Sequence, residues 1–457
     1  MRPKADPASL STQQSFIDEP GVELVEFINL HHPLVKLAEQ IDWRRFEVYW
    51  SSQFGTAGGP RALPSRLVAG LFMLKSLEGL SDERLIEAWI CNPYYQYFCG
   101  ERFFQHGAPI DPATLVKWRK RLGESGMGCI HDMVLAGSID SGALKRVNLS
   151  HVCVDSTVME KSIAYPTDSE LLVKVLTKLV VLMRCHGLSV RQSYCRVAPR
   201  LGQQIGRYAH ARQYKRMRKG LKRLSTLTAR VARELERQLG LLPEAVQQEA
   251  EVLLRQAQQL RHQALNPKCK HKVYSLHEPQ VDCISKGKAR VRYEFGTKVG
   301  ISCTQQEGFV LAMRSLPGNP YDGHTLDELL ARTQQVTDRA IKTVVVDLGY
   351  RSRHRTSAKV IHRGKKLSKA EKKRLRRRSM LEAMIGHMKN DGALDRCYLK
   401  GTEGDMIHAM LCGVGHNLRL LYNFLVKQLS RLFFACFIDR IGKRLRFNLY
   451  RPDLLAA

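Results

Sequence analysis

The sequence predicts an α/β protein in which a mixed sheet with flanking helices is interrupted by an all-helical insertion and preceded by an all-α domain. Two short apolar runs, 152–158 and 343–347, are rich in the β-branched residues typical of buried strands. Residues 22–135 and 170–265 instead place apolar residues at helical spacing. Further strand signals occur at 272–275, 291–301 and 308–313.

Composition bounds the class of protein. The chain has 457 residues, 44% of them hydrophobic, so it can bury a large core and divide into two or three domains. Its formal net charge of +30 points to a polyanionic partner, and nucleic acid is the commonest. A solvated basic face, or association with the ribosome, is the alternative interpretation.

Cysteine usage and hydropathy indicate the compartment. The 12 cysteines include no CxxC pair and no zinc-finger spacing, which is typical of reduced, buried thiols in a cytosolic protein. The N-terminus lacks the apolar region of a signal peptide. Charged residues interrupt the most apolar stretches, 171–183 and 418–438. We therefore expect a soluble cytoplasmic protein without a membrane span.

The N-terminal helical stretch predicts a DNA-binding domain. Start and stop signals divide it into helices that include 65–78, 82–92 and 112–122. In the third of these, apolar residues would face inward, leaving Lys117, Arg119 and Lys120 outside and available to DNA. A basic surface helix of an ordinary bundle is the alternative.

The second helical stretch predicts an all-helical insertion, such as a coiled hairpin. It carries dense positive charge between 212 and 223. Its basic face either tracks a phosphate backbone or is a solvated helical surface, and the composition leaves both interpretations open. Without this insertion the elements run strand, strand, strand, strand, helix, strand, helix. That order resembles a ribonuclease-H-like fold.

Three acidic residues are candidate metal ligands. Asp155 and Asp347 each follow an apolar run, where an α/β sheet presents groups to its crevice, and Glu382 lies on a predicted helix over 373–389. Carboxylate oxygens are the ligands that Mg²⁺ prefers, and two ions about 4 Å apart can clamp the attacking and leaving oxygens of a phosphodiester. Asp168 is an alternative first ligand, which we expect instead to cap a helix.

The predicted helix places cations beside Glu382. Arg378 lies four residues before it and Lys389 seven after, so all three fall on nearly one stripe at 100° per residue. The two cations could bind phosphate. A separate apolar stripe, which can bury against the sheet, consists of Leu381, Met384, Ile385 and Met388. An exposed surface helix is the alternative interpretation.

At these residues the chain resembles bacterial insertion-sequence transposases of the DDE class, in the group of the insertion-sequence-five family. That group carries Tyr, two residues, Arg, three residues, Glu, six residues, Lys. Arg378, Glu382 and Lys389 fit the spacing, and Leu375 stands at the tyrosine position. Other similar stretches, in the family's order, are 63–123, 154–158, 164–168, 293–296, 317–325 and 386–391.

The resemblance implies a mechanism and partners. Asp155, Asp347 and Glu382 would form a triad that binds two Mg²⁺ or Mn²⁺ ions, and Arg378, His387 and Lys389 would contact DNA. The protein would bind double-stranded DNA at the terminal inverted repeats of its own element, cleave it, and transfer the strand into target DNA by a cut-and-paste route. It would act as a homo-oligomer on DNA, associated with the bacterial nucleoid.

Two other function classes remain open. One is a catalytically silent DNA-binding protein, such as a decayed element retained as a repressor. The other is a structural RNA-binding protein, which the lack of an aromatic-rich single-strand motif disfavours. The predicted boundaries are a disordered N-terminus (1–20), a helical DNA-binding domain (21–143), a catalytic domain (144–169 with 270–430), the helical insertion (170–269) and a C-terminal tail (431–457).

Overall fold

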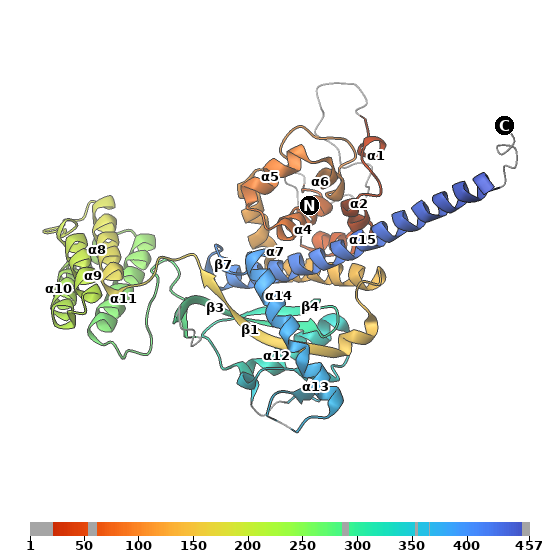
Figure 1. Cartoon of the computed structure of the whole chain (residues 1–457). Coiled ribbons are helices and arrows are strands. Elements are labelled where there is room, and N and C mark those ends of the chain that lie inside the picture. The colour runs from red at the N-terminus through yellow and green to blue at the C-terminus, as the bar shows by residue number, and fades with distance from the viewer. Residues whose placement is uncertain (1–21, 54–61, 286–291, 352–354, 365, 450–457) are drawn as a thin grey trace, which may run out of the picture.

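The computed structural model describes residues 22–53, 62–285, 292–351, 355–364 and 366–449, with side chains up to residue 431. Figure 1 shows helices from the N-terminal part above a sheet, and a separate helical bundle to the left. The expected mixed α/β architecture is confirmed. The predicted disordered segment 1–20 and the last residues of the predicted tail lie outside the described residues.

The N-terminal part is all helical, as predicted. The expected helices over 65–78 and 82–92 are confirmed as α4 and α5. The third is much longer than predicted, because helical structure resumes beyond Gly123, whose positive φ of 56° makes a kink rather than an end. The helices are α1 (Leu24–Phe27), α2 (Pro33–Glu39), α3 (Trp43–Ser52), α4 (Ser65–Glu78), α5 (Asp82–Cys91), α6 (Pro93–Phe98) and α7 (Pro112–Asp140).

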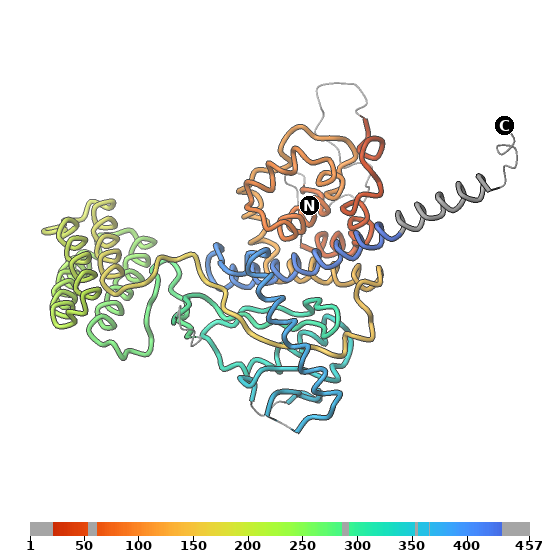
Figure 2. Tube along the Cα trace, in the orientation of Figure 1, coloured from red at the N-terminus to blue at the C-terminus, as the bar shows by residue number. Residues whose placement is uncertain are grey.

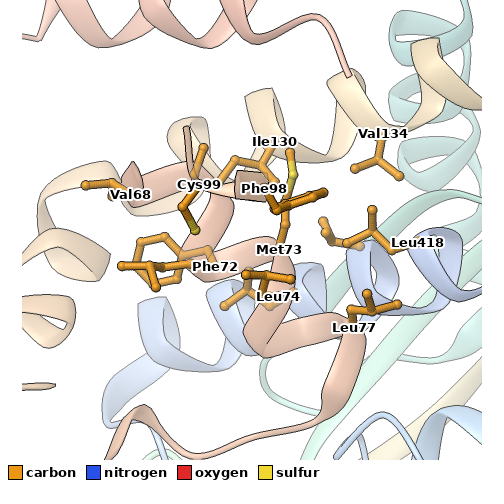
Figure 3. Close-up of a cluster of buried hydrophobic side chains, with 14 of the residues drawn as sticks. Val68, Phe72, Met73, Leu74, Leu77, Phe98, Cys99, Ile130, Val134 and Leu418 are labelled. Atoms are coloured by element: carbon orange, nitrogen blue, oxygen red, sulfur yellow. The ribbon is translucent and has the colours of Figure 1, made fainter. Parts of the chain in front are cut away.

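The core of this part includes a helix from the other end of the chain. Figure 3 shows Phe72 and Leu74 of α4 and Ile130 of α7 in one buried cluster with Leu418. Leu418 belongs to α15 (Gly401–Leu449), which packs on α4 and α7. The N-terminal helices therefore depend on a C-terminal helix to complete their core. The predicted tail boundary at 431 falls inside this helix.

The sheet is mixed and has seven strands. Its main path runs β2-β3-β1-β5-β6, with β4 paired to β3 and β7 paired to β1. Strands β2, β3, β4 and β1 pair antiparallel, whereas β5, β6 and β7 join in parallel. The strands are β1 (His151–Lys161), β2 (Asp282–Ser285), β3 (Tyr293–Thr304), β4 (Val310–Leu316), β5 (Thr343–Val345), β6 (Lys359–Ile361) and β7 (Arg396–Cys397).

Four of the five predicted strands are confirmed, and the one at 272–275 is wrong. There the side chain of Gln263 hydrogen-bonds both the N–H and the carbonyl of Val273, at 2.8 and 3.0 Å. A helix side chain thus satisfies the backbone groups that a neighbouring strand would otherwise pair. The strands β2, β6 and β7 were not predicted; they are two to four residues long.

Helices cover both faces of the sheet. Val152 and Val154 of β1 pack in the cluster that contains α12 (Asp322–Thr337). Cys153 and Met159 point the other way, into a cluster with α14 (Arg378–Asn390) and α15. In α14, Leu381, Met384 and Met388 are buried, which confirms the predicted apolar stripe. The preceding α13 (Lys369–Arg376) is separate, so the helix predicted over 373–389 is broken at Arg377.

The insertion is a four-helix bundle rather than a hairpin. It consists of α8 (Asp168–Cys185), α9 (Val197–His210), α10 (Tyr214–Gln238) and α11 (Glu244–Leu265) around a core of their own residues. The fully helical prediction is confirmed. Asp168 is the first residue of α8, and its neighbour Thr167 is the cap, accepting from the N–H of Glu170. Asp168 instead accepts from Gln263 at 2.9 Å.

Two further expectations concern membrane spans and the cysteines. Among the described residues no helix is long and apolar enough to cross a membrane. The described cysteines are free thiols, and burial raises the pKa of Cys153 to about 12, so this thiol stays protonated at neutral pH.

A close contact fixes α15 against α4. Arg419 donates to the carbonyl oxygens of Ser76 and Leu77 at 2.9 and 2.8 Å, and these last-turn carbonyls have no partner within their own helix. One turn earlier, Gly415 lies against the Ser76 carbonyl, so that a Cβ at this position would overlap it. The absence of a side chain at Gly415 is what allows the approach.

We therefore expect Gly415→Ala to lower the free energy of unfolding by about 1–3 kcal/mol, because the added methyl group must push the two helices apart. Gly386→Ala on α14 is the matched control, since no atom lies within 4 Å of its added Cβ. That change should be neutral or stabilise by up to about 1 kcal/mol. Denaturant unfolding measures both, and equal stabilities would contradict the close contact.

Candidate active site

The strand β1 aims Asp155 at α14. Side chains alternate along a strand, and Cys153 and Met159, which flank Asp155 at even spacing, are buried on the α14 side. Asp155 was expected to end its strand. It lies instead within an eleven-residue strand, because Thr157, Val158 and Met159 continue the buried pattern beyond it. Its position on the correct face follows from the alternation, not from the strand end.

The register of two parallel strands brings Asp347 beside Asp155. Cys153 pairs with Val345, and each aspartate stands two residues further along its own strand direction. Asp347 lies just past β5, at the start of the short 3-10 helix Leu348–Tyr350. Because the strands run parallel, the two carboxylates lie at the same level on neighbouring strands of the sheet.

The guanidinium of Arg378 contacts all three candidate carboxylates. Its Nη2 lies 3.0 Å from Asp155 Oδ2 and 3.4 Å from Asp347 Oδ2. Its Nη1 lies 3.3 Å from Glu382 Oε1, one helical turn along α14. Three elements remote in sequence, β1, the end of β5 and α14, thus bring their acids to one positive charge.

The three carboxylates differ in their access to solvent. The Asp155 side chain is 15% exposed, whereas those of Asp347 and Glu382 are 48% and 62% exposed. Burial raises the pKa of Asp155, and Arg378 and the N–H of Ser156 only partly oppose this. Burial also acts to lower the pKa of Arg378, but the three carboxylates raise it above its ordinary value. The guanidinium therefore stays charged, and Asp155 depends on it.

The three carboxylates are chemically suited to bind divalent metal ions. The groups are oxygen ligands from three carboxylates, and the site requires a compensating cation, which Arg378 now supplies. Among the residues that the structure describes, no three His, Cys, Asp or Glu side chains lie close enough to hold a metal ion as they stand. The carboxylates surround the guanidinium instead, so ligation requires Arg378 to release them.

Comparisons with known proteins identify the family. Residues 22–121 match the family described as Transposase domain (DUF772), and residues 267–418 match the family described as Transposase DDE domain. The chain is also similar to a Rhizobium meliloti protein named "Uncharacterized protein ORF8 in nfe locus", with 44% identity over 187 residues, which is 41% of this chain and 90% of that protein. No solved structure matches the chain.

The chain belongs to a transposase family with a DDE domain. The two matched regions support a DNA-cleaving insertion-sequence transposase, and DDE domains of this kind normally use divalent metals. The DDE match includes Asp347 and Glu382 but begins after Asp155. The helical bundle from α8 to α11 lies between the two matched regions.

The transposase carries further polar residues beside Asp155 that the sequence analysis did not assign. Ser156 Oγ donates to Asp322 Oδ1 at 2.9 Å, and Lys298 Nζ lies 3.3 Å from the same oxygen. Burial, with Asp322 and Asp155 nearby, raises the pKa of Tyr350 well above its ordinary value. Asp322 lies in the 317–325 stretch that resembles the family, which was the available signal for it.

The remaining predicted DNA contacts on α14 fall into two kinds. Lys389 Nζ donates to the carbonyl of Val158 on β1 at 2.7 Å, so it ties the helix to the strand. His387 is exposed, with Nδ1 3.4 Å from Asp391 Oδ2. Of these two, His387 presents its side chain to solvent in the transposase, and Lys389 is half-buried.

One predicted DNA contact in the N-terminal helices is corrected. Lys117 and Lys120 on α7 are exposed, as expected. Arg119 is only 4% exposed and donates to Asp82 Oδ1 at 2.6 Å, beside Lys75. The hydrogen bonds from Arg119 and Lys75 outweigh burial and lower the pKa of Asp82. The prediction that Arg119 is available to DNA is wrong, because the residue lies on the inner stripe with Leu115 and Leu122.

The balance at Arg378 predicts a pH-dependent stability. Because burial raises the pKa of Asp155, stability is lost as the pH rises through that pKa, and Arg378 limits the loss. Arg378→Gln should therefore destabilise the metal-free protein by about 1.5–3 kcal/mol near neutral pH. The difference from wild type should shrink at acidic pH, where Asp155 is protonated.

The control for this change is Arg396→Gln, which removes an exposed arginine that lies 3.9 Å from Glu160. An exposed pair of this kind contributes less than about 1 kcal/mol. Thermal unfolding across the pH range measures both variants. A loss in Arg378→Gln that grows as the pH falls would contradict the assignment.

Proposed function

We propose that this transposase cleaves and transfers DNA strands at a two-metal site formed by Asp155, Asp347 and Glu382. The convergence of three carboxylates on Arg378, from β1, the end of β5 and α14, is the observation that supports it most directly. The long strands β4, β3 and β1 pair antiparallel, and β5 and β6 continue the sheet in parallel; this order supports a ribonuclease-H-like assignment for residues 144–169 with 270–430.

The protein groups have separable roles in this proposal. Two Mg²⁺ or Mn²⁺ ions, when bound, would activate a water or a DNA 3′-hydroxyl and stabilise the departing oxygen. Asp155 is fixed by the N–H of Ser156, which donates to its Oδ1 at 2.8 Å, so its other oxygen, Oδ2, is held toward Arg378. Arg378, once released by the carboxylates, can turn its planar fork toward a phosphate. Lys389 holds α14 against β1 and so keeps Glu382 in register with Asp155.

The DNA substrate is also part of the proposal. We infer that the protein binds terminal inverted repeats of its own element, with Lys117 and Lys120 on α7 and His387 on α14 contacting the DNA. It would act as a homo-oligomer by a cut-and-paste route, in the insertion-sequence-five group. The residues 21–143 would form the DNA-binding domain, and 170–269 the insertion.

The alternative is a catalytically silent DNA-binding protein. Leu375, where the family group has tyrosine, favours it, because a hydroxyl or ring at that position is missing and the leucine instead packs partly buried against the cluster under α14. Cleavage by the purified protein separates the two functions.

The test of the site is metal-dependent nicking of DNA that carries the ends flanking the gene. Asp155→Asn, Asp347→Asn and Glu382→Gln should each lower the nicking rate by more than about 100-fold while DNA binding persists, because each removes a metal ligand. Asp395→Asn, which removes an exposed acid shortly after the same helix, should not. Binding without nicking by the wild type would favour the silent binder, and nicking that survives the triad changes would refute the site.

The test of the N-terminal contacts compares neighbours on α7. Lys117→Gln and Lys120→Gln should weaken binding to the element ends while thermal stability is unchanged, because both side chains are exposed. Arg119→Gln should instead lower stability by about 1.5–3 kcal/mol, because it removes one of the two cations that hold the buried Asp82 and leaves only Lys75. Equal effects of all three changes on binding, at unchanged stability, would contradict this division.

A further inference from the structure

The helical bundle contains the most one-sided charge in the chain. From Leu171 to Arg233, 63 consecutive residues include 16 Lys and Arg and no Asp or Glu. All 16 of these basic residues are exposed. Over the whole chain the excess of basic residues is 30, so this segment carries more than half of it. Packing does not require such an imbalance, because the core of the bundle is apolar.

The basic side chains of this segment are not neutralised within the protein. Within the described ranges none of them pairs with a carboxylate. Their hydrogen bonds go to neutral groups: Arg216 to Gln213, Arg230 to Tyr194 and Arg233 to the Ala229 carbonyl. This contrasts with Arg119, Arg378 and Lys161, each of which is held by carboxylates. The charge on the bundle is therefore available to a partner.

One helix arranges this charge in a line. On α10, Lys215, Lys219 and Lys222 follow at spacings of four and three residues, and at 100° per residue Arg230 and Arg233 continue the same stripe. Between Lys215 and Arg233 the stripe is about 27 Å long at 1.5 Å per residue. That length approaches one turn of B-form DNA, which is about 34 Å.

The chemistry of the stripe suits phosphates rather than bases. After Tyr214 at its start, α10 contains no Phe, Tyr or Trp, so the length of the stripe offers no row of rings on which successive unpaired bases could stack. Long basic side chains on a rigid helix can instead follow the phosphates of a duplex without reading its sequence. The last helix of the bundle differs, since α11 carries Glu244, Glu249 and Glu251.

The bundle is attached to the sheet through fixed contacts. The two connecting segments, yellow and green in Figure 2, leave and re-enter the sheet region. Tyr165 of the first and Tyr274 of the second both pack on the ring of Phe295 in β3, at 5.4 and 5.3 Å. Lys161, at the end of β1, lies 3.1 Å from Glu278 in the second segment. The stripe is thus presented from an anchored arm.

We propose that the stripe on α10 (Lys215, Lys219, Lys222, Arg230 and Arg233) binds the phosphate backbone of double-stranded DNA without sequence preference, as a contact independent of the carboxylate site. Its function is to hold a length of duplex on the bundle while the carboxylate site acts elsewhere. The contact adds affinity for any duplex, and it requires no metal ion.

The experiment measures binding of the full chain to a duplex of arbitrary sequence, about 40 base pairs long, in chelator, between about 50 and 200 mM salt. Chelation prevents cleavage, so the outcome is independent of the catalytic proposal. The test variant is Lys215→Gln, Lys219→Gln and Lys222→Gln combined. The matched control is Arg255→Gln, Lys268→Gln and Lys270→Gln, which removes the same charge from exposed positions on α11 and the segment after it.

Loss of three phosphate contacts should lower the slope of log affinity against log salt by about 2.7, and the control should change it by less than about 1. Both variants should keep the helix content and melting temperature of the wild type. Equal slopes for the two variants, or a wild-type slope for the stripe variant, would overturn the proposal. So would tighter binding of single-stranded RNA that depends on the same three lysines.

Discussion

The contact of one guanidinium with three carboxylates holds together the part of the protein where the sheet meets α14. Acids brought this close repel one another, and Asp155 is also largely removed from water, so burial favours its neutral form. Arg378 compensates, and in doing so it holds β1, the end of β5 and α14 in one arrangement. In the proposed function, metal ions would supply the positive charge that Arg378 supplies to these carboxylates in this structure.

The replacement of Arg378 by metal ions, as proposed, would change which groups this side chain of α14 contacts. While Arg378 serves as counter-ion, its Nη atoms are directed at carboxylates, and its buried Nε has no hydrogen-bond partner among the described groups. In the proposed function the carboxylates would hold metal ions, and Arg378 would then be able to donate from Nε to a phosphate oxygen. In that proposal Arg378 both stabilises the fold and contacts substrate, while Lys389 of α14 holds the helix through its hydrogen bond to the Val158 carbonyl on β1.

The helix α15 sets the relation between the two matched regions. It contributes Leu418 to the core of the N-terminal helices and Ala409 and Cys412 to the core under α14. Arg419 and Gly415 fix it to the end of α4. Helix α7, which packs on α15, is therefore held at a defined position relative to the carboxylates, and the bundle has a core of its own and is joined to the sheet region by two connecting segments.

The features that the sequence could predict are those that depend on interactions between residues close together in the sequence. Local periodicity located most helices, four strands and the three acids, because these depend on neighbours in sequence. It could also have placed Arg119 on the inner face, since 115, 119 and 122 form one helical stripe; the charge of the residue concealed this, and its partner Asp82 is 37 residues away. The strand predicted around Val273 was wrong for the same reason, because a side chain of α11 pairs with its backbone in place of a neighbouring strand.

The positive charge shows most clearly what the sequence alone could not predict. A count of basic residues does not distinguish those that form ion pairs inside the fold from those that are available to bind a partner. Arg119 and Arg378 contribute to the net charge, yet both are held by carboxylates inside the fold. The lysines of α10 contribute equally to the count and are exposed, with no carboxylate from their own segment to neutralise them. Only burial and partners, which need the tertiary structure, distinguish the two kinds. Once they are distinguished, the excess positive charge is concentrated on an arm outside the regions that the transposase families match, and this location is what makes the bundle a candidate for its own contact with DNA.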